Sequence, residues 1–271
     1  MRKLAVLTPL ALLGGLFAMG TAQAAPPADG DRIALIVGVD HHQGATRSNM
    51  GAVGDAEDVR DLLVRRGWRS ENVRMLTDGA ATAGAIRDGL SWLASQSNDN
   101  SFAVFHYSGH VKQTGSTEYL WPHDNQFISD TDVVNTLRGV KGYLWADFSG
   151  CEAAGFDEGL SGPKSLVTAA SQSWEKGYEL PAELRNSVFT NLLVDKALMK
   201  KQGDANGDGK VSIQEAFRHA EALAPLITSD QSFGPQHPYM AGGDGDDWFV
   251  DRAATPYSGR AAKRSCFLIF C

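Results

Sequence analysis

One histidine and one cysteine lie at the ends of two apolar segments, and each has a glycine directly before it. His110 closes the stretch FHYSGH, and Cys151 lies about forty residues later in ADFSGCEAAGF. A cysteine attacks as its thiolate, and a neighbouring histidine can take up the thiol proton. The two residues could form a catalytic dyad, or they could be a buried cysteine and an unrelated surface histidine.

Small residues beside this pair suit the same chemistry. Gly109 and Gly150 would let a substrate backbone come close, and backbone N–H groups near them could stabilise an oxyanion. This combination is typical of acyl transfer, including peptide-bond hydrolysis.

Strands must position the two residues, and the hydrophobic pattern predicts them. Continuous apolar runs favour strands buried on both faces, and helical spacing of apolar residues appears between these runs. The expected strands are 32–40, 72–79, 101–110, 141–151 and 165–173, and the expected helices are 52–68, 82–96, 129–140, 188–203 and 212–226. This alternation predicts an α/β layered fold with a mostly parallel central sheet flanked by helices. Ligands bind outside the carboxyl ends of such strands, so we expect His110 and Cys151 to share one edge.

The ends of the chain differ from this alternating body. Residues 1–24 have a basic start, an apolar middle and an Ala-Gln-Ala end, which is the pattern of a secretory signal peptide. We therefore expect export, to the periplasm or to the outside medium. Residues 25–31 are expected to be a linker, and 253–271 a C-terminal tail. No later segment approaches the roughly 20 apolar residues of a membrane helix, so we expect no membrane contact after signal removal.

The net charge and the number of cysteines limit which binding partners and disulfides are expected. The net charge of −7 makes nucleic acid an unexpected partner and is compatible with a cationic substrate or a bound cation. Of three cysteines, Cys266 and Cys271 lie in the tail and could pair with each other. Such a pair would leave Cys151 as the odd thiol of an exported chain.

The stretch DANGDGKVSIQE at 204–215 has the pattern of an EF-hand-type calcium loop. Such a loop supplies oxygen ligands from positions 1, 3, 5, 7, 9 and 12, with glycine at position 6. Gly209 falls at position 6, and the ligands would be Asp204, Asn206, Asp208, the carbonyl of Lys210, Ser212 and Glu215. We expect Ca²⁺ to have a structural role here, and the alternative is a polar turn that binds nothing.

Several motifs in order resemble the caspase-like cysteine peptidases, and most closely their bacterial metacaspase-like, or orthocaspase, branch. YSGH is followed by a strand, an aspartate and C-x-x-x-G-F, and the segments IALIVGVD, GAVGDAEDVRDLLVRRGW, EYLWPHD, NSVFTNLLVDKAL and QHPYMAGG also resemble that family. The resemblance implies a caspase-like domain over 32–252 that includes the loop at 204–215. It implies that His110 is the base, Cys151 the nucleophile, and a peptide or protein the substrate.

Two positions depart from the family pattern. The family usually has glycine after the histidine, where this chain has Val111. It also usually reads Asp-x-Cys-x-Ser-Gly, whereas Asp147 lies four residues before Cys151 and Ser149 takes the nearer place. With a different register, Ser149 would occupy the cysteine position. These departures also leave open a degenerate, inactive member.

The resemblance implies a preference for Arg or Lys before the cut, through an acidic pocket. Asp55 matches one acid of that pocket, although a carboxylate near a helix N-terminus is also favoured by the helix dipole. Ser149 stands where the second acid is usual, and Asp147 or Glu152 could substitute for it.

The interpretation favoured by the sequence is an exported cysteine endopeptidase that cuts after Arg or Lys and is stabilised by calcium. The main alternative is an inactive, calcium-binding module that binds peptides or proteins in the same cleft. An acyl transferase with the same dyad is a further alternative.

Overall fold

The computed structural model describes residues 25–179, 185–243, 245 and 247–252. The predicted signal peptide and C-terminal tail, with Cys266 and Cys271, lie outside the described residues. Among the described residues, no helix has both the length and the apolar character needed to cross a membrane.

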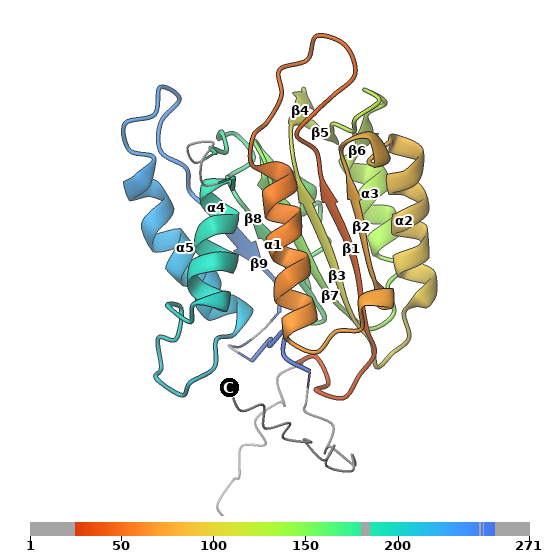
Figure 1. Cartoon of the computed structure of the whole chain (residues 1–271), viewed down its shortest axis with the longest axis vertical. Coiled ribbons are helices and arrows are strands. Elements are labelled where there is room, and N and C mark those ends of the chain that lie inside the picture. Colours follow the sequence, from red (N-terminus) through yellow and green to blue (C-terminus); the bar gives the residue numbers. More distant parts are fainter. Residues whose placement is uncertain (1–24, 180–184, 244, 246, 253–271) are drawn as a thin grey trace, which may run out of the picture.

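A mostly parallel, six-stranded sheet forms the centre of the molecule (Figure 1). Its mostly parallel arrangement was predicted, whereas its last strand, β9, was not. Its strand order is β2-β1-β3-β7-β8-β9, and every pair is parallel except β8 with β9. The strands are β1 (Arg32–Gly38), β2 (Val73–Thr77), β3 (Phe102–Ser108), β7 (Tyr143–Ser149), β8 (Ser165–Ala169) and β9 (Tyr239–Ala241). Every residue of β1 and β3 is buried, which explains why both strands read as continuous apolar runs.

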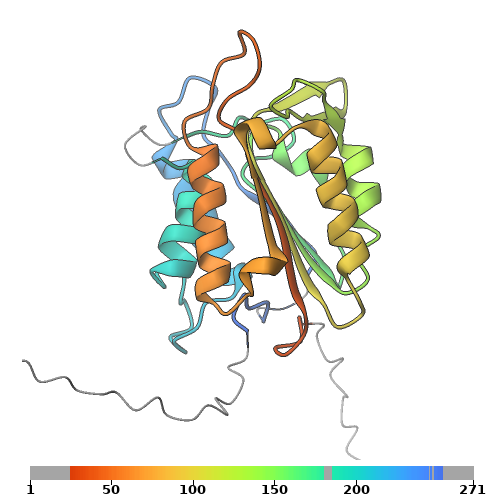
Figure 2. The ribbon, with the colours of Figure 1, turned by 45° about the vertical axis from the view of Figure 1, so that its right-hand side comes forward.

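Helices cover both faces of this sheet, and the two layers are seen side-on in Figure 2. The helices are α1 (Ala52–Arg65), α2 (Ala83–Gln96), α3 (Asp130–Leu137), α4 (Val188–Thr190) with the π-helix η5 (Asn191–Met199), and α5 (Ile213–Ile227). α1, α4, η5 and α5 lie on one face, and α2 and α3 on the other (Figures 1 and 2). The expected helix at 188–203 thus begins as one α-helical turn and continues as a π-helix.

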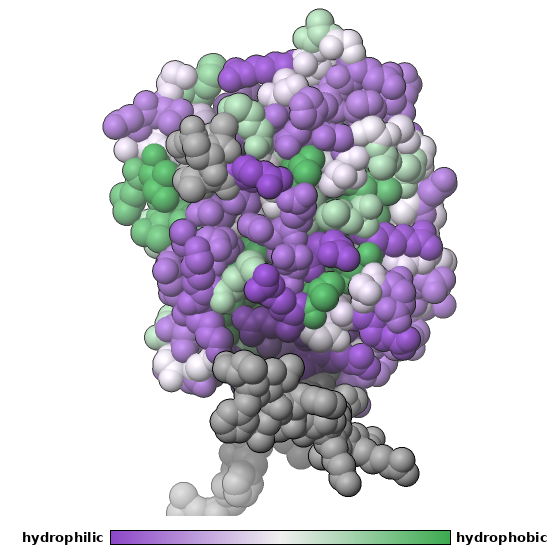
Figure 3. Space-filling view, viewed as in Figure 1, coloured by the Kyte–Doolittle hydropathy of each residue, from purple (hydrophilic) through white to green (hydrophobic). Residues whose placement is uncertain are grey.

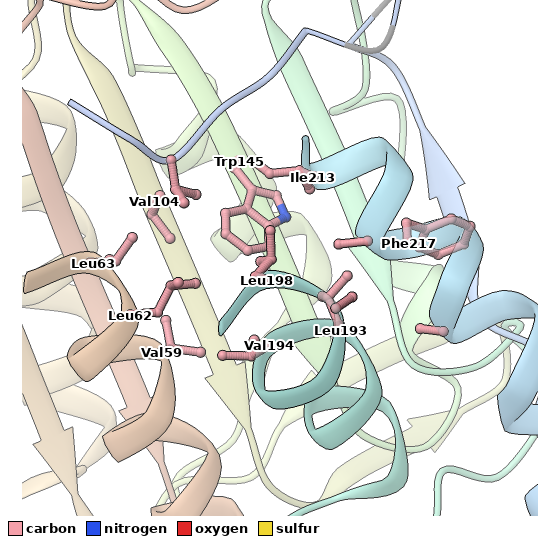
Figure 4. Packing of buried hydrophobic residues seen from close by; sticks show 14 of the residues in the cluster. Val59, Leu62, Leu63, Val104, Trp145, Leu193, Val194, Leu198, Ile213 and Phe217 are labelled. Atoms are coloured by element: carbon pink, nitrogen blue, oxygen red, sulfur yellow. The ribbon is translucent and has the colours of Figure 1, made fainter. Parts of the chain in front are cut away.

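Each face has its own hydrophobic core. Figure 4 shows the core beneath α1, η5 and α5, where Trp145 of β7 lies among Leu62, Leu193, Leu198 and Ile213. The outer surface over this layer is mostly hydrophilic, with apolar residues in small separate groups (Figure 3). The helices are therefore amphipathic, as their spacing predicts.

A second, three-stranded antiparallel sheet follows β3 and was not predicted. It consists of β4 (Val111–Thr114), β5 (Thr117–Leu120) and β6 (Ile128–Ser129). Its strands are short and carry many polar residues, so periodicity gives little signal for them. Three 3₁₀ turns complete the described elements: η1 (Ser70–Asn72), η2 (Asp78–Ala80) and η3 (Ala153–Phe156).

The carboxyl end of β1 contacts the start of α1 at Gly38. A Cβ atom at Gly38 would lie 2.4 Å from Ala52 O and 2.8 Å from the Cβ of Ala56. We expect Gly38→Ala to destabilise the protein by about 2–3 kcal/mol, because backbone atoms must move to relieve the overlap. Urea unfolding would measure this loss. Gly84→Ala is the matched control, since a Cβ there meets nothing within 4 Å. Equal midpoints for the two variants would contradict the prediction.

Candidate active site

The register between β3 and β7 brings the two candidate residues to one edge of the sheet. Ser108 pairs with Ser149, and the Gly109 N–H donates to the Ser149 carbonyl at 3.1 Å. His110 and Cys151 each lie two residues beyond this pair. A cleft of about 540 Å³ opens here, and both residues line it.

Loops around His110 orient its ring. Its Nε2 donates to the carbonyl oxygen of Arg47 at 2.8 Å, since a carbonyl can only accept. The ring stacks on His42, with centroids 5.3 Å apart, and Trp121 packs at an angle against both rings. Because Nε2 carries the hydrogen, the neutral ring keeps a lone pair on Nδ1 for use as a base.

His42 is held neutral beside that ring. Its Nδ1 donates to the Pro122 carbonyl at 3.1 Å, and burial lowers the pKa of His42, with the nearby His110 and His123 acting in the same direction. A neutral His42 adds no positive charge next to the ring of His110.

Cys151 is half-buried at the start of the loop after β7. Its Sγ lies 3.9 Å from the carbonyl oxygen of Gly177, which can accept the thiol hydrogen. Burial raises the pKa of this thiol. Within the described residues, no hydrogen bond joins Sγ to the ring of His110. The arrangement therefore favours the thiol form of Cys151 in the cleft that it shares with His110.

The two predicted glycines have different surroundings. The Gly109 N–H is already bonded to Ser149, so it cannot hold an oxyanion in this arrangement. A Cβ at Gly150 would lie 2.8 Å from the Gly109 oxygen and 2.9 Å from Cγ2 of Val111. The Gly109 carbonyl oxygen and the Val111 side chain together fill the space beside Gly150, so a larger residue would not fit there.

Asp55 lies beneath the cleft in a network of hydroxyl groups. It is fully buried and accepts from Ser108 Oγ at 2.7 Å, Asn186 Nδ2 at 3.1 Å and Ser187 N at 3.0 Å. Burial raises the pKa of Asp55 to about 6. Ser187 Oγ in turn bonds to Ser149 Oγ at 2.8 Å. Ser108, Ser149 and Ser187 line the cleft, and Asp55 lies behind them.

The other two acids predicted to bind substrate lie elsewhere. Asp147 is fully buried one pleat below Ser149, where it bonds to His106 Nδ1 at 2.7 Å and to Thr168 Oγ1. Glu152 has a left-handed backbone conformation and forms an ion pair with Lys176. Neither acid is among the described residues that line the cleft, which corrects that part of the prediction.

Among the described residues, Glu179 is the acid that lines the cleft, and it was missed. Its Oε1 accepts from the N–H groups of Met50 and Gly51 at 2.8 and 2.9 Å. Lys176 and Ser187 were missed as well. All three follow β8 in irregular segments, where no periodicity or motif indicates that the chain returns to the cleft.

The predicted calcium loop lies at the lower end of the molecule in Figure 1, away from the carboxyl ends of β3 and β7. Asp204 accepts from the N–H groups of Gly207 and Gly209 at 2.8 and 3.0 Å, and both glycines have positive φ. Glu215 forms a capping box with Ser212 at the start of α5. The loop therefore folds around its first acid, with its last acid fixed on a helix. A separate acidic group brings carboxylate oxygens of Glu118, Asp130 and Glu158 within 4.8 Å of one another.

A parallel α/β sheet that presents a histidine and a cysteine in one cleft has the architecture of a cysteine-peptidase fold. The sequence model of the caspase domain matches residues 31–224, and the chain belongs to that family.

Metacaspases are among the relatives of this chain. Metacaspase-1 of Cryptococcus neoformans is 32% identical over 127 residues, which are 40% of this chain and 28% of the relative. Metacaspase-3 of Arabidopsis thaliana is 31% identical over 117 residues, which are 37% of this chain and 32% of the relative. The matches thus span about a third or less of the length of these curated relatives.

Solved structures share the fold. Caspase-1 from Spodoptera frugiperda superimposes with a TM-score of 0.60 at 11% identity, over 86% of this chain and 95% of its own. Protein GSU0716 from Geobacter sulfurreducens also gives 0.60, at 16% identity over 82% of this chain and 98% of its own. At these identities the likeness shows the fold alone.

Proposed function

We propose that the protein is an exported cysteine endopeptidase of the caspase family, stabilised by calcium. The observation that supports the activity is the pairing of β3 with β7, because the residues that follow the two strands, His110 and Cys151, line one cleft. Nε2 of His110 donates to Arg47, so Nδ1 is the atom that would act as the base. Export rests on the signal-peptide pattern of residues 1–24.

The reaction would proceed through an acyl-enzyme. The Cys151 thiol gives its proton to His110 Nδ1, and the thiolate attacks the substrate carbonyl carbon. The tetrahedral intermediate collapses as His110 returns the proton to the leaving amine. Water then adds to the thioester, with His110 again taking and returning a proton, and frees the acid and the thiol.

A basic side chain before the cut fits the charges below the cleft. It would enter between the hydroxyl groups of Ser108 and Ser149, with Asp55 behind them and Glu179 at the side. An ammonium or guanidinium group can donate to these hydroxyl oxygens while the carboxylates offset its charge. The net charge of −7 acts in the same direction over longer range.

Fluorogenic peptides test the activity and the preference together. The panel carries Arg, Lys, Asp or Ala before the reporter group and is assayed with calcium present. We expect cleavage after Arg and Lys, and little after Asp or Ala. Equal rates across the panel would support the endopeptidase activity but contradict the preference for Arg and Lys. If no peptide and no unfolded protein were cleaved, the endopeptidase activity itself would be contradicted.

An inactive binding module is the second candidate. The raised pKa of Cys151 and the bond of the Gly109 N–H to Ser149 favour it, because thiolate and oxyanion donors are both restricted in this arrangement. Calorimetric binding of an Arg-containing peptide that stays intact for days would support this candidate.

We also propose that the loop at 204–215 binds Ca²⁺ as a structural ion. We expect calcium to raise the unfolding temperature by about 5 °C or more over that in EDTA, because a ligand of the native state stabilises it by mass action. Glu215→Gln should remove most of this rise, while glutamine retains the helix capping box. Glu221→Gln, exposed on the same helix, is the control. An unfolding temperature that calcium does not change would contradict the proposal.

A further inference from the structure

The segment Glu175–Gly177 packs directly on the residues that follow β7. The Glu152 N–H donates to the Glu175 carbonyl at 2.8 Å. A Cβ at Gly177 would lie 2.5 Å from the Gly150 oxygen and 3.4 Å from the Cys151 nitrogen. These contacts hold the backbone of Lys176, which lies between them, beside Cys151.

Lys176 and Glu152 form an ion pair next to the thiol. Lys176 Nζ contacts Glu152 Oε1, and the Lys176 side chain is 42% exposed whereas that of Glu152 is 7% exposed. Lys176 and Cys151 both line the cleft. A buried carboxylate directly after a cysteine disfavours the thiolate by charge repulsion, and an ammonium group bound to that carboxylate offsets the repulsion.

The electrostatic effects on the thiol agree with this geometry. Burial raises the pKa of Cys151, the charges of Glu152 and Glu179 raise it further, and the charge of Lys176 lowers it. Within the described residues the ring of His110 forms no hydrogen bond to the thiol.

We propose that Lys176 is a positioning residue for the cysteine nucleophile: its ammonium group holds and neutralises the Glu152 carboxylate, so that the Cys151 thiolate can form in the cleft. The proposal rests on the proposed role of Cys151. It also gives Glu152 a function other than substrate binding, which is to anchor Lys176. Lys176 is 42% exposed but Glu152 is 7% exposed, so Lys176→Met leaves a buried carboxylate without its partner, and thermal unfolding of each variant is the control for folding.

Alkylation of Cys151 by iodoacetamide tests the proposal without any peptide. Cys266→Ser and Cys271→Ser in the full chain leave Cys151 as the single cysteine of the sequence. The thiol proton passes to solvent, the thiolate sulfur forms a bond to the methylene carbon, and iodide leaves. Mass spectrometry follows the modified chain across a range of pH.

We expect Lys176→Met to slow alkylation about 3- to 10-fold near neutral pH and to move the pH profile upward. Glu152→Gln should move the profile downward, and Lys176→Arg should restore the parental profile because it keeps the charge. The difference between Lys176→Met and the parent should shrink in about 1 M salt, which screens the pair. Lys164→Met, outside the cleft, is the matched control.

Two results would overturn the proposal. One is a Lys176→Met profile that superimposes on the parental profile. The other is equal slowing by Lys176→Met and Glu152→Gln, which would indicate loop geometry rather than charge. The same experiments separate this proposal from the endopeptidase function. Charge-dependent alkylation without peptide cleavage would support the role of Lys176 and contradict only the endopeptidase. Peptide cleavage with charge-independent alkylation would contradict only the role of Lys176.

Discussion

Cys151→Ala is expected to lower the rate of peptide cleavage by at least about 1,000-fold, because alanine has no nucleophilic atom to form the acyl-enzyme. Ser149→Ala is expected to retain cleavage within about 10-fold of the parent. Ser149 Oγ is bonded to Ser187 Oγ in the wall of the cleft, and its loss removes one hydrogen bond rather than the nucleophile. The measurement is kcat/KM on the best peptide of the fluorogenic panel.

These two variants separate the two registers that the sequence permits. In the structure Ser149 is the last residue of β7 and pairs with Ser108, whereas Cys151 lies two residues beyond and corresponds in the register to His110. If Ser149→Ala abolished cleavage and Cys151→Ala retained it, the nucleophile would be Ser149. Thermal unfolding of both variants provides the control for folding, since each removes one small side-chain group.

Most of the central sheet could be predicted because β1, β3, β7 and β8 are buried along almost their whole length. β1 and β3 are continuous apolar runs, and each ends in small or polar residues at the edge where the cleft lies. The expectation that His110 and Cys151 share one edge followed from the parallel direction of the strands that precede them. The small sheet β4-β5-β6 did not follow, because short strands with alternating polar residues resemble loops.

The floor of the cleft could be predicted only in part. Asp55 lies near the start of α1, and it contacts Ser108 because α1 packs on β3. Its donors Asn186 and Ser187 come from a segment about 130 residues later, and nothing in their local pattern indicates that contact. Side-chain direction was the second obstacle: Asp147 and Ser149 share one face of β7, yet one is in the core and the other in the cleft.

Asp147→Ala is expected to destabilise the protein by about 3–5 kcal/mol, because it breaks a fully buried charged or hydrogen-bonded pair and leaves the partner unpaired. His106 Nδ1 would lose its partner, and His106 Nε2 already has none among the described residues. Thr168, which also receives a hydrogen bond from Trp145 Nε1 at 2.8 Å, would lose its acceptor. Urea unfolding at neutral pH measures the loss, and Asp88→Ala, exposed on α2, is the control.

A second variant tests whether Asp147 is a member of a buried pair or an acid that binds substrate. The double variant His106→Phe with Asp147→Leu replaces both polar partners by apolar side chains, so it should recover part of the stability that Asp147→Ala loses. The residual peptidase activity of that double variant should keep its preference for Arg and Lys, because Asp147 lies behind Ser149 rather than in the cleft. If Asp147→Ala were as stable as Asp88→Ala and cut without a basic preference, Asp147 would be a pocket acid after all, and β7 would have to shift its register in solution to expose it.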